Sequence, residues 1–480
     1  MVVPGYDSAT SIALCSAILG DRDEFTGSTD ERVSVQWVGN LVLYFADRDA
    51  GSLDESDLEM NQWDLIVIGG GAAGLWAGGT AAQKGCKVLV LEKNNKAGPK
   101  ILMSGGTRCN ITHDCDWRAI VEAFGREGRF LSSALHHLPP TEVIRTIEAE
   151  GVATKREITG KIFPVSDRAI DVRDALVRRM TRSGGELQTG TAIKDVRRSS
   201  DGIGFEVVSE DHVWHSKRLL ISTGGLSYPG CGTTGDGYPW LQRFGHTVTP
   251  LRPALTPLVS SVPWLNDLQG ITLPDASVQV ELLDESAGGS KRKDPRLVAR
   301  GGLLWTHFGL SGPAPMNVSR AVSDLPPGHH STLHIDLVPD RKSEQLALWF
   351  QSATQSGSRT LLNTLSDLIP RRLAQTTIEL SQIPIDKPLA EVSKKHRQDL
   401  LDRIKNFTIP LHGTRGYSKA EVTAGGVVLS EVHPQSMESK LVPGLFLAGE
   451  VLNLDGPIGG FNFQAAFSTG HLAGMSQGTT

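Results

Sequence analysis

The stretch "WDLIVIGGGAAGLWAGGTAAQKGCKVLVLEKN", residues 63–94, decides the fold of this chain. An apolar run leads into a glycine turn with the spacing Gly69-x-Gly71-x-x-Gly74, small residues follow, and a second apolar run ends at Glu92. A strand before this pattern, a helix after it and an acid roughly 20 residues further on are typical of a dinucleotide-binding βαβ unit. We expect Glu92 to accept hydrogen bonds from the adenosine ribose.

Each glycine has its own expected role in the turn. Gly69 permits the tight bend, Gly71 lets the backbone approach a pyrophosphate, and Gly74 allows the helix to pack closely on the strand. The helix begins around Ala72 and Ala73, and its N-terminus directs free N–H groups at the anion. A second stretch with this spacing, "GCGTTG" at 230–235, lacks both the strand and the acid. We therefore predict there only a glycine loop that can face the cofactor.

The loop after Glu92 favours FAD over NAD. It reads "KNNKAGPKILMSGGTRCNIT" and is rich in polar groups and glycine. NAD enzymes have no standard need for such a loop, whereas the ribitol arm of FAD needs extra donors along its length. A solvated surface loop is the alternative interpretation. The candidate FAD ligands in the loop are Lys100, Ser104, Gly105, Gly106, Arg108 and Asn110.

Three later segments are predicted to reach the same site. "GGELQTGTAIKDVRR" places the backbone of Ile193 against an adenine, and "RLLISTGG" ends a buried strand at Thr223, Gly224 and Gly225. "LVPGLFLAGE" ends the last strand at Gly449 and Glu450, where we expect the carboxylate to hold the ribitol hydroxyls. "GPIGGFNFQAAFSTG" then starts a helix whose N-terminus would stabilise a reduced, anionic flavin. The first and last parts of the chain thus share one predicted site.

Composition excludes several classes of protein. The chain has 480 residues and a net charge of -5, which gives no general attraction to nucleic acid, so no nucleic-acid partner is expected. Its five cysteines form no metal-ligand spacing, so no metal site is predicted and the thiols suit a reducing cytoplasm. The apolar run at 11–20 is too short to span a bilayer, so no membrane association is expected. Oligomeric state stays open.

The patterns predict an interrupted FAD domain. We expect residues 1–59 to form an accessory extension that is partly disordered, with a short hairpin in "VSVQWVGNLVLYF"; whether it belongs to the working enzyme stays open. The first part of the FAD domain is predicted to span 60–252 and its C-terminal part 411–480. Between them, 253–410 is expected as an inserted domain, with a β-barrel over about 253–339 and helices over about 340–406. In the insert, Ser311 is expected to cap a helix that begins around Pro313 and that can face the flavin.

The chain resembles the BaiN/RdsA-type, YhiN-like FAD-dependent oxidoreductases. The resemblance runs from about Asp64 to Gly474 and rests on "IVIGGGAAGL", "SGGTRCNIT", "GKIFPVSDRAIDVRDAL", "STGGLSYPGCGTTGDGY", "THFGLSGPAPMNVSR", "VTAGGV" and "MESKLVPGLFLAGEVLNLDGPIGGFNFQAAFSTGHLAG". It implies an α/β fold: a discontinuous, Rossmann-like FAD-binding domain of glutathione-reductase topology with an inserted β-barrel and helical domain. It adds Lys93, Cys109, Gly459, Gly460, Phe461 and Asn462 to the expected FAD-binding residues. One departure from the family pattern is Thr107, where a third glycine would be expected.

The predicted function is hydride transfer between flavin N5 and a small organic substrate. The resemblance implies reduction of conjugated double bonds with NAD(P)H, and for other members an amine oxidase activity of the aminoacetone type. A flavoprotein with an RNA-associated or non-enzymatic role is the alternative of a different class. No second Rossmann unit is present, so NAD(P)H would visit the flavin transiently. Neither Cys109 nor His307 is assigned as catalytic, and the catalytic acid or base stays unknown.

Overall fold

The computed structural model describes residues 33–38, 41–46, 62–200, 202–282, 297–326, 331–354 and 359–478. The chain divides into two units, residues 1–61 and residues 62–480. In the first unit, β1 (Val33–Val38) and β2 (Leu41–Ala46) pair antiparallel, as their alternating sequence predicts. The rest of the extension, for which partial disorder is expected, lies outside the described residues.

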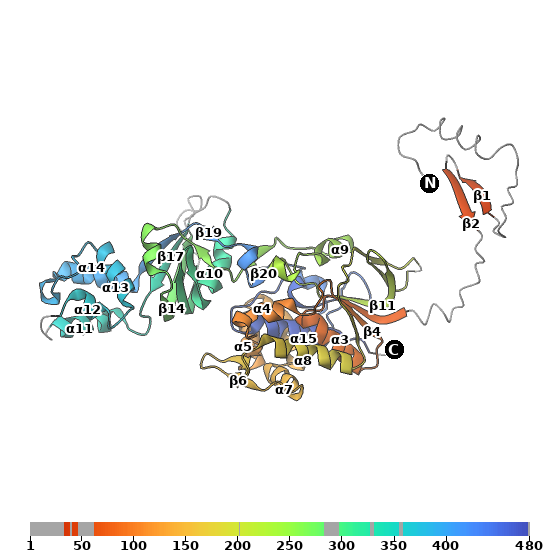
Figure 1. Cartoon of the computed structure of the whole chain (residues 1–480), viewed down its shortest axis with the longest axis horizontal. Helices are drawn as coiled ribbons and strands as arrows, with labels where there is room; N and C mark the ends of the chain where they lie inside the picture. The colour runs from red at the N-terminus through yellow and green to blue at the C-terminus, as the bar shows by residue number, and fades with distance from the viewer. Residues whose placement is uncertain are drawn as a thin grey trace. The chain divides into compact units, whose positions relative to one another are not determined.

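A parallel sheet organises the second unit (Figure 1). Its strands follow the spatial order β8–β4–β3–β11–β21. They are β3 (Gln62–Ile68), β4 (Val88–Leu91), β8 (Glu186–Gln188), β11 (Val213–Ile221) and β21 (Leu445–Leu447). The first half of β11 also pairs with an antiparallel hairpin, β9 (Asp195–Arg198) and β10 (Phe205–Val208). Because β21 comes from the C-terminal segment, the end of the chain completes the sheet that β3 begins.

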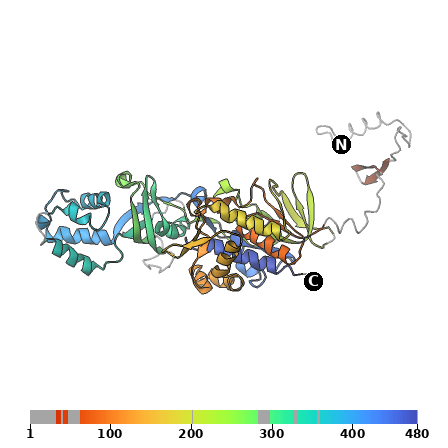
Figure 2. The same cartoon turned by 60° about the horizontal axis from the view of Figure 1, so that its bottom comes forward.

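Three helices pack side by side next to this sheet, as both views show (Figures 1 and 2). They are α3 (Ala72–Gln83), α8 (Ala169–Arg182) and α15 (Phe461–Met475), with α3 between the other two. Glycines bring α15 very close to α3: a Cβ on Gly470 would lie 2.3 Å from the carbonyl oxygen of Ala73, and one on Gly474 would lie 2.5 Å from that of Ala77. The small residues of the first and last helices therefore form one interface.

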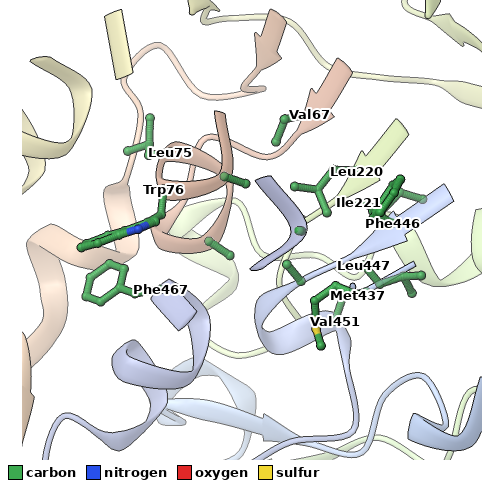
Figure 3. Packing of buried hydrophobic residues seen from close by; sticks show 14 of the residues in the cluster. Val67, Leu75, Trp76, Leu220, Ile221, Met437, Phe446, Leu447, Val451 and Phe467 are labelled. Atoms are coloured by element: carbon green, nitrogen blue, oxygen red, sulfur yellow. The ribbon is translucent and has the colours of Figure 1, made fainter. Parts of the chain in front are cut away.

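Large apolar side chains are buried on both sides of these helices, some against the sheet and some away from it (Figure 3). Trp76 of α3 and Phe467 of α15 are buried, and their ring centroids are 4.9 Å apart. Leu220 and Phe446, from the adjacent strands β11 and β21, are buried in the same cluster. Since an aromatic side chain buries about 150–250 Å² of surface, this contact between the two chain ends is a major part of the core.

Smaller elements surround the sheet. The region 99–164 contains α4 (Pro99–Thr107), β5 (Thr112–His113), α5 (Trp117–Ala123), η1 (Glu127–Leu131), α6 (Ser132–His137), α7 (Pro140–Ala149), β6 (Thr154–Arg156) and β7 (Lys161–Pro164). Later come η2 (Pro229–Cys231), α9 (Gly237–Arg243), η6 (Tyr417–Lys419), η7 (Leu429–Glu431) and η8 (Gly449–Val451). Within the described ranges, no helix combines the length and the apolar character needed to cross a membrane.

The insert contains an antiparallel sheet that closes on itself. Its spatial order is β18–β17–β14–β15–β16–β13–β19. The strands are β13 (Leu258–Val259), β14 (Thr272–Leu282), β15 (Val298–Thr306), β16 (Gly309–Ser311), β17 (Ser331–Asp336), β18 (Phe407–Leu411) and β19 (Gly413–Thr414). The two edge strands, β18 and β19, are neighbours in the chain, so one segment joins both edges into a barrel. This sheet extends beyond residue 410, the predicted end of the insert.

A helix and a separate helical group complete the insert. Helix α10 (Pro313–Ser323) packs against β14 and β15. The helical group consists of α11 (Ser343–Thr354), α12 (Leu361–Leu365), α13 (Arg371–Leu380), η5 (Leu389–Glu391) and α14 (Lys394–Lys405), and η3 (Pro263–Leu268) lies before β14. The insert has its own hydrophobic core. It connects to the Rossmann part through the two-stranded pairing of β12 (Arg252–Ala254) with β20 (Val422–Ala424).

We expect His471 of α15 to make the fold sensitive to acid. Burial, with a smaller effect of Arg179, lowers the pKa of this side chain from 6.5 to about 4, so it is neutral in the folded protein. The unfolded chain takes up a proton near pH 6.5, so the stabilisation is complete above that pH and is lost as pH falls towards 4. From about 1.4 kcal/mol per pKa unit, we expect a loss of roughly 2–3 kcal/mol.

The measurement is the free energy of unfolding in urea at pH 7.5 and at pH 4.5. His471→Gln has no imidazole to protonate and is expected to lose less stability over this range than the wild type. Equal losses in both proteins would contradict the assignment to His471.

Candidate functional site

A cavity of about 490 Å³ lies where the strands β3 and β11 end. Ile68 and Ser222, at the carboxyl ends of these strands, line it. The first turns of α3 and α15 reach it from one side, and residues of the insert line its other wall. Ligands of open α/β sheets bind in a crevice at this position, outside the carboxyl ends of the parallel strands.

The glycine turn after β3 has three different environments. A Cβ on Gly69 would lie 2.6 Å from the carbonyl oxygen of Ser222, and one on Gly74 would lie 1.9 Å from the carbonyl oxygen of Gly69. A Cβ on Gly71 would meet nothing within 4 Å, because this residue faces the cavity. No side chain caps the N-terminus of α3, so its first N–H groups are available to an anion.

Glu92 lies at the end of β4 and lines the cavity. Its carboxylate is buried and accepts hydrogen bonds from the backbone N–H of Gly70 at 2.8 Å and from that of Asn94 at 2.9 Å. These bonds hold the carboxylate beside the glycine turn, in the position expected for a ribose ligand. Lys93 also lines the cavity, and its Nζ lies 2.5 Å from Oδ2 of Asp236.

The last three residues of α4 have a left-handed backbone conformation. Gly105 has φ 56°, Gly106 has φ 67° and Thr107 has φ 69°. At Thr107 the chain thus keeps the backbone conformation that a third glycine would favour, although a threonine occupies it, at a cost of about 1–2 kcal/mol. A Cβ on Gly106 would meet nothing within 4 Å, so this loop also presents bare backbone to the cavity.

The C-terminal glycine turn faces the cavity from the start of α15. Gly459 has φ 142° and Gly460 has φ 92°, and no side chain caps the helix. The side chain of Asn462 accepts a hydrogen bond from the N–H of Gly456 at 2.8 Å, which shapes the preceding loop. The first turn of α15 therefore lines the cavity without a side-chain cap at its N-terminus, an arrangement that suits negative charge.

Glu450 joins segments that are far apart in the chain. Its carboxylate accepts hydrogen bonds from Nζ of Lys100 at 2.5 Å, from Oγ of Ser227 at 2.5 Å and from the backbone N–H of Thr423 at 2.8 Å. The side chain is 18% exposed. The carboxylate lines the cavity but already has protein partners, so it holds the site together in addition to any contact with a ligand.

Most of the residues predicted to bind the cofactor line this cavity together. They are Gly69, Gly71, Ala72, Ala73, Glu92, Lys93, Lys100, Ser104, Gly105, Gly106, Asn110, Ile193, Thr223, Gly224, Gly449, Glu450, Gly459, Gly460 and Asn462. The predicted glycine loop contributes Cys231, Gly232 and Thr233.

Five predicted residues are not among the residues that line the cavity. Gly74 packs against Gly69, and Gly225 lies against Glu450 and Thr423. Arg108 pairs with Glu157 at 2.8 Å and lies over the ring of Phe163, and the ring of Phe461 stacks on His113. Cys109 is fully buried, and burial raises the pKa of its thiol to about 12. The Cys109 thiol therefore stays protonated.

The insert forms the far wall of the cavity, mainly through the start of α10. Ser311 is not the N-cap that its sequence predicts, because the helix N-cap is Gly312 with φ 95°, and no side chain caps it. A left-handed glycine turns the chain one residue later than expected. The helix start nevertheless faces the cavity, with Ser311, Gly312, Pro313 and Met316 in the lining. His307 is exposed and is not among the lining residues.

Two contacts tie α10 to the C-terminal glycine loop. Arg320 binds the carboxylate of Asp455 through Nη1, at 2.5 and 2.7 Å. The N–H of Ile458 donates to the side-chain oxygen of Asn317 at 2.8 Å. Burial raises the pKa of Asp455 to about 6, although Arg320 acts in the opposite direction. The wall of the insert and the loop before α15 are therefore held as one surface.

Sequence reasoning missed several polar residues of the site. Ser227 and Thr423 bind Glu450, while Tyr228 and Glu421 line the cavity. Ser227 and Tyr228 belong to the "LSYP" before the glycine loop, where a backbone φ of 59° at Tyr228 is unusual for a side chain of that size. Glu421 directly precedes the "VTAGGV" stretch. The only available signal was their adjacency to recognised glycine motifs.

The cavity fits a flavin dinucleotide. Bare backbone at Gly71 and Gly106 leaves room for a pyrophosphate and a ribitol arm, and the open first turn of α3 matches the negative charge of the phosphates. Glu92 and the start of α15 line the same cavity. Within the described residues, no group of three or more His, Cys, Asp or Glu side chains is arranged to hold a metal ion.

Comparison with known proteins gives consistent matches. The family model described as HI0933-like protein Rossmann domain matches residues 63–476. The chain is 34% identical over 413 residues to the ribosomal RNA dihydrouridine synthase of Escherichia coli, covering 85% of this chain and 96% of that protein. It is 29% identical over 418 residues to the 3-dehydro-bile acid delta(4,6)-reductase of Clostridium scindens, covering 85% and 98%. A solved 3-ketosteroid delta1-dehydrogenase from Sterolibacterium denitrificans is 13% identical, with a TM-score of 0.47, covering 87% of this chain and 99% of that one.

Proposed function

The chain belongs to the family of HI0933-like Rossmann-domain proteins, and on this premise we propose that it uses FAD to reduce a carbon–carbon double bond conjugated with a carbonyl group. The membership confirms the predicted family, the Rossmann-type FAD-binding fold, FAD as the cofactor and the prediction of a FAD-dependent oxidoreductase. The bond that is reduced, the substrate and the residues that bind FAD are the parts of the assignment that we propose.

The observation that carries the proposal is the shape of the cavity. It runs from the glycine turn of α3, where FAD would bind, to an apolar wall that includes Met316 of the insert. A flat, conjugated substrate can therefore lie between the flavin ring and the insert. The names of the two relatives agree in chemistry: dihydrouridine is uridine whose C5=C6 bond has been saturated beside a carbonyl, and the bile acid enzyme is a reductase of double bonds near an oxo group.

The residues of the chain would position the reactants. The open N-terminus of α3 and the bare backbone at Gly71 and Gly106 would hold the phosphates and the ribitol arm. When bound, FAD supplies hydride transfer. The N-terminus of α15 would stabilise negative charge on the pyrimidine end of the ring, and the apolar side chains of the insert would exclude water from the reacting carbon atoms.

Two substrate classes fit this chemistry, and the relatives favour RNA. The prediction that no nucleic acid binds rests on the net charge of the whole chain, which is -5. The charge is uneven: residues 341–406 of the insert contain eleven Lys and Arg against seven Asp and Glu. A locally basic region can bind phosphates even when the whole protein is acidic. We therefore propose a uracil ring in ribosomal RNA as the first substrate and a small conjugated oxo compound, as predicted, as the second.

The remaining components follow from the same chemistry. NAD(P)H is the proposed reductant of the flavin, and it would bind transiently because the described residues form no second Rossmann unit. The cytoplasm is the proposed compartment, since the cysteines at 86, 109, 115 and 231 are free thiols.

The test uses the purified, FAD-loaded protein reduced without oxygen. It is mixed separately with ribosomal RNA transcribed in vitro, which contains no modified bases, and with a steroid acid that has a 4,6-diene beside a 3-oxo group. We expect one of them to reoxidise the flavin and to gain two hydrogen atoms per saturated bond, measured by mass spectrometry. The fully saturated steroid and a transcript made with dihydrouridine are the matched controls. A separate control shows that dioxygen can reoxidise the reduced flavin of the same protein. If neither substrate reoxidises the flavin in that protein, the proposal is refuted.

A further inference from the structure

Glu421 projects into the cavity from the junction between the insert and the Rossmann part. It directly precedes β20, and its backbone N–H donates to the carbonyl oxygen of Leu255 at 3.1 Å. Leu255, Met316 and Val422 form a small apolar cluster, with Ile458 packed against it, and these residues also line the cavity. The carboxyl group of Glu421 therefore faces the cavity beside an apolar wall.

Glu421 differs from the other acids of the lining. Glu92 accepts bonds from Gly70 and Asn94, Asp236 pairs with Lys93, and Glu450 pairs with Lys100. For Glu421, in contrast, no hydrogen bond or ion pair engages the carboxyl group within the part of the chain that the structure describes. A carboxyl group without a protein partner is free to exchange a proton with a bound molecule.

The surroundings of Glu421 favour its protonated form. Glu421 is exposed to water, and it lines the cavity. Burial raises the pKa of this carboxyl group, Lys100 lowers it to a smaller extent, and Glu450 raises it again. A carboxylic acid with a raised pKa can hold a proton closer to neutral pH and donate it during a reaction.

We propose that Glu421 is the catalytic acid that protonates the substrate, an inference that rests on the proposed reduction of a conjugated double bond. The β-carbon accepts a hydride, with its electron pair, from the reduced flavin, and the π electrons form a new C–H bond at the α-carbon with the proton of Glu421. The substrate gains two electrons and two hydrogen atoms, the flavin is oxidised, and the carboxylate recovers its proton from water.

Other cavity residues are less suited to this role. The Nζ atoms of Lys93 and Lys100 are each held by a carboxylate at 2.5 Å, which stabilises their protons where they are. Burial raises the pKa of the Cys231 thiol, which weakens it as an acid. Tyr228 lines the cavity and is the competing donor, so it is included in the test.

The experiment compares two half-reactions of the FAD-loaded protein in the stopped flow. Glu421→Gln keeps the size of the side chain but has no acidic proton. We expect NAD(P)H to reduce the flavin of this variant at the wild-type rate. Reoxidation by the substrate, which is either the transcript or the steroid, should be roughly 100- to 10,000-fold slower than in the wild type. Glu421→Asp should recover part of the rate. In the wild type, reoxidation should slow as pH rises through the pKa of Glu421, and the Gln variant should lack this dependence.

The outcomes separate the two proposals. Glu122→Gln, at an exposed glutamate of α5 that does not line the cavity, is the matched control and should behave as wild type. If Glu421→Gln is reoxidised within about threefold of the wild-type rate, or if Tyr228→Phe alone is slow, the role of Glu421 is overturned and the proposed function stands. If neither substrate reoxidises the wild type, the proposed function is refuted and the role of Glu421 falls with it.

Discussion

Gly71→Val is expected to give a folded protein that has lost its FAD. The backbone of Gly71 has φ −85° and ψ −166°, which valine adopts without strain, and a Cβ there meets nothing within 4 Å. The two methyl groups would instead fill the space for the pyrophosphate and separate it from the first N–H groups of α3. Two lost charge-assisted hydrogen bonds, at about 1.5–3 kcal/mol each, correspond to a loss in affinity of at least about 100-fold.

The flavin absorbance after gel filtration and the thermal unfolding of the apo-protein are the two measurements. Gly74→Ala is the matched control from the same turn, because its Cβ would lie 1.9 Å from the carbonyl oxygen of Gly69. That variant should lose stability as the apo-protein, whereas Gly71→Val should unfold close to the wild-type temperature. If Gly71→Val retains its full FAD content, the pyrophosphate does not bind at this turn.

Glu450→Ala is expected to weaken both FAD binding and the fold. The substitution leaves Lys100 without its carboxylate partner and the N–H of Thr423 without an acceptor. Because the two charged side chains are only 18% and 27% exposed, we expect a loss of roughly 2–4 kcal/mol in the free energy of unfolding. If the carboxylate also holds the ribitol arm, FAD affinity should fall by about 10- to 150-fold.

Titration of the apo-protein with FAD by quenching of flavin fluorescence separates the two effects. Glu450→Gln is the control, since its amide oxygen can still accept from Ser227 and from Thr423. It should retain part of the stability, since Lys100 still loses its carboxylate partner, and it should bind FAD more weakly than the wild type because the charge is gone. An unchanged Kd in both variants would leave Glu450 with a purely structural role.

The Rossmann unit was predictable because its signals are local. The run from β3 through the glycine turn to Glu92 places the strand, the helix and the acid within one short stretch, and each glycine has a single physical requirement. The expectation that the chain end returns to this site was also sound, because a strand, a glycine turn and a helix are repeated there. The helix cap at Ser311 was mispredicted, since a serine one residue before a left-handed glycine looks the same as a true cap.

The sequence by itself determined the βαβ unit, the bare backbone at Gly71 and the kind of cofactor, because these depend on backbone shape within a few consecutive residues. Only the tertiary structure decided which polar side chains meet. Lys100 and Glu450 are 350 residues apart, and Glu421 enters the cavity only because the insert returns to the Rossmann part at β20. A side chain's partners, and with them its pKa, depend on segments that folding brings together, and no local pattern records that contact.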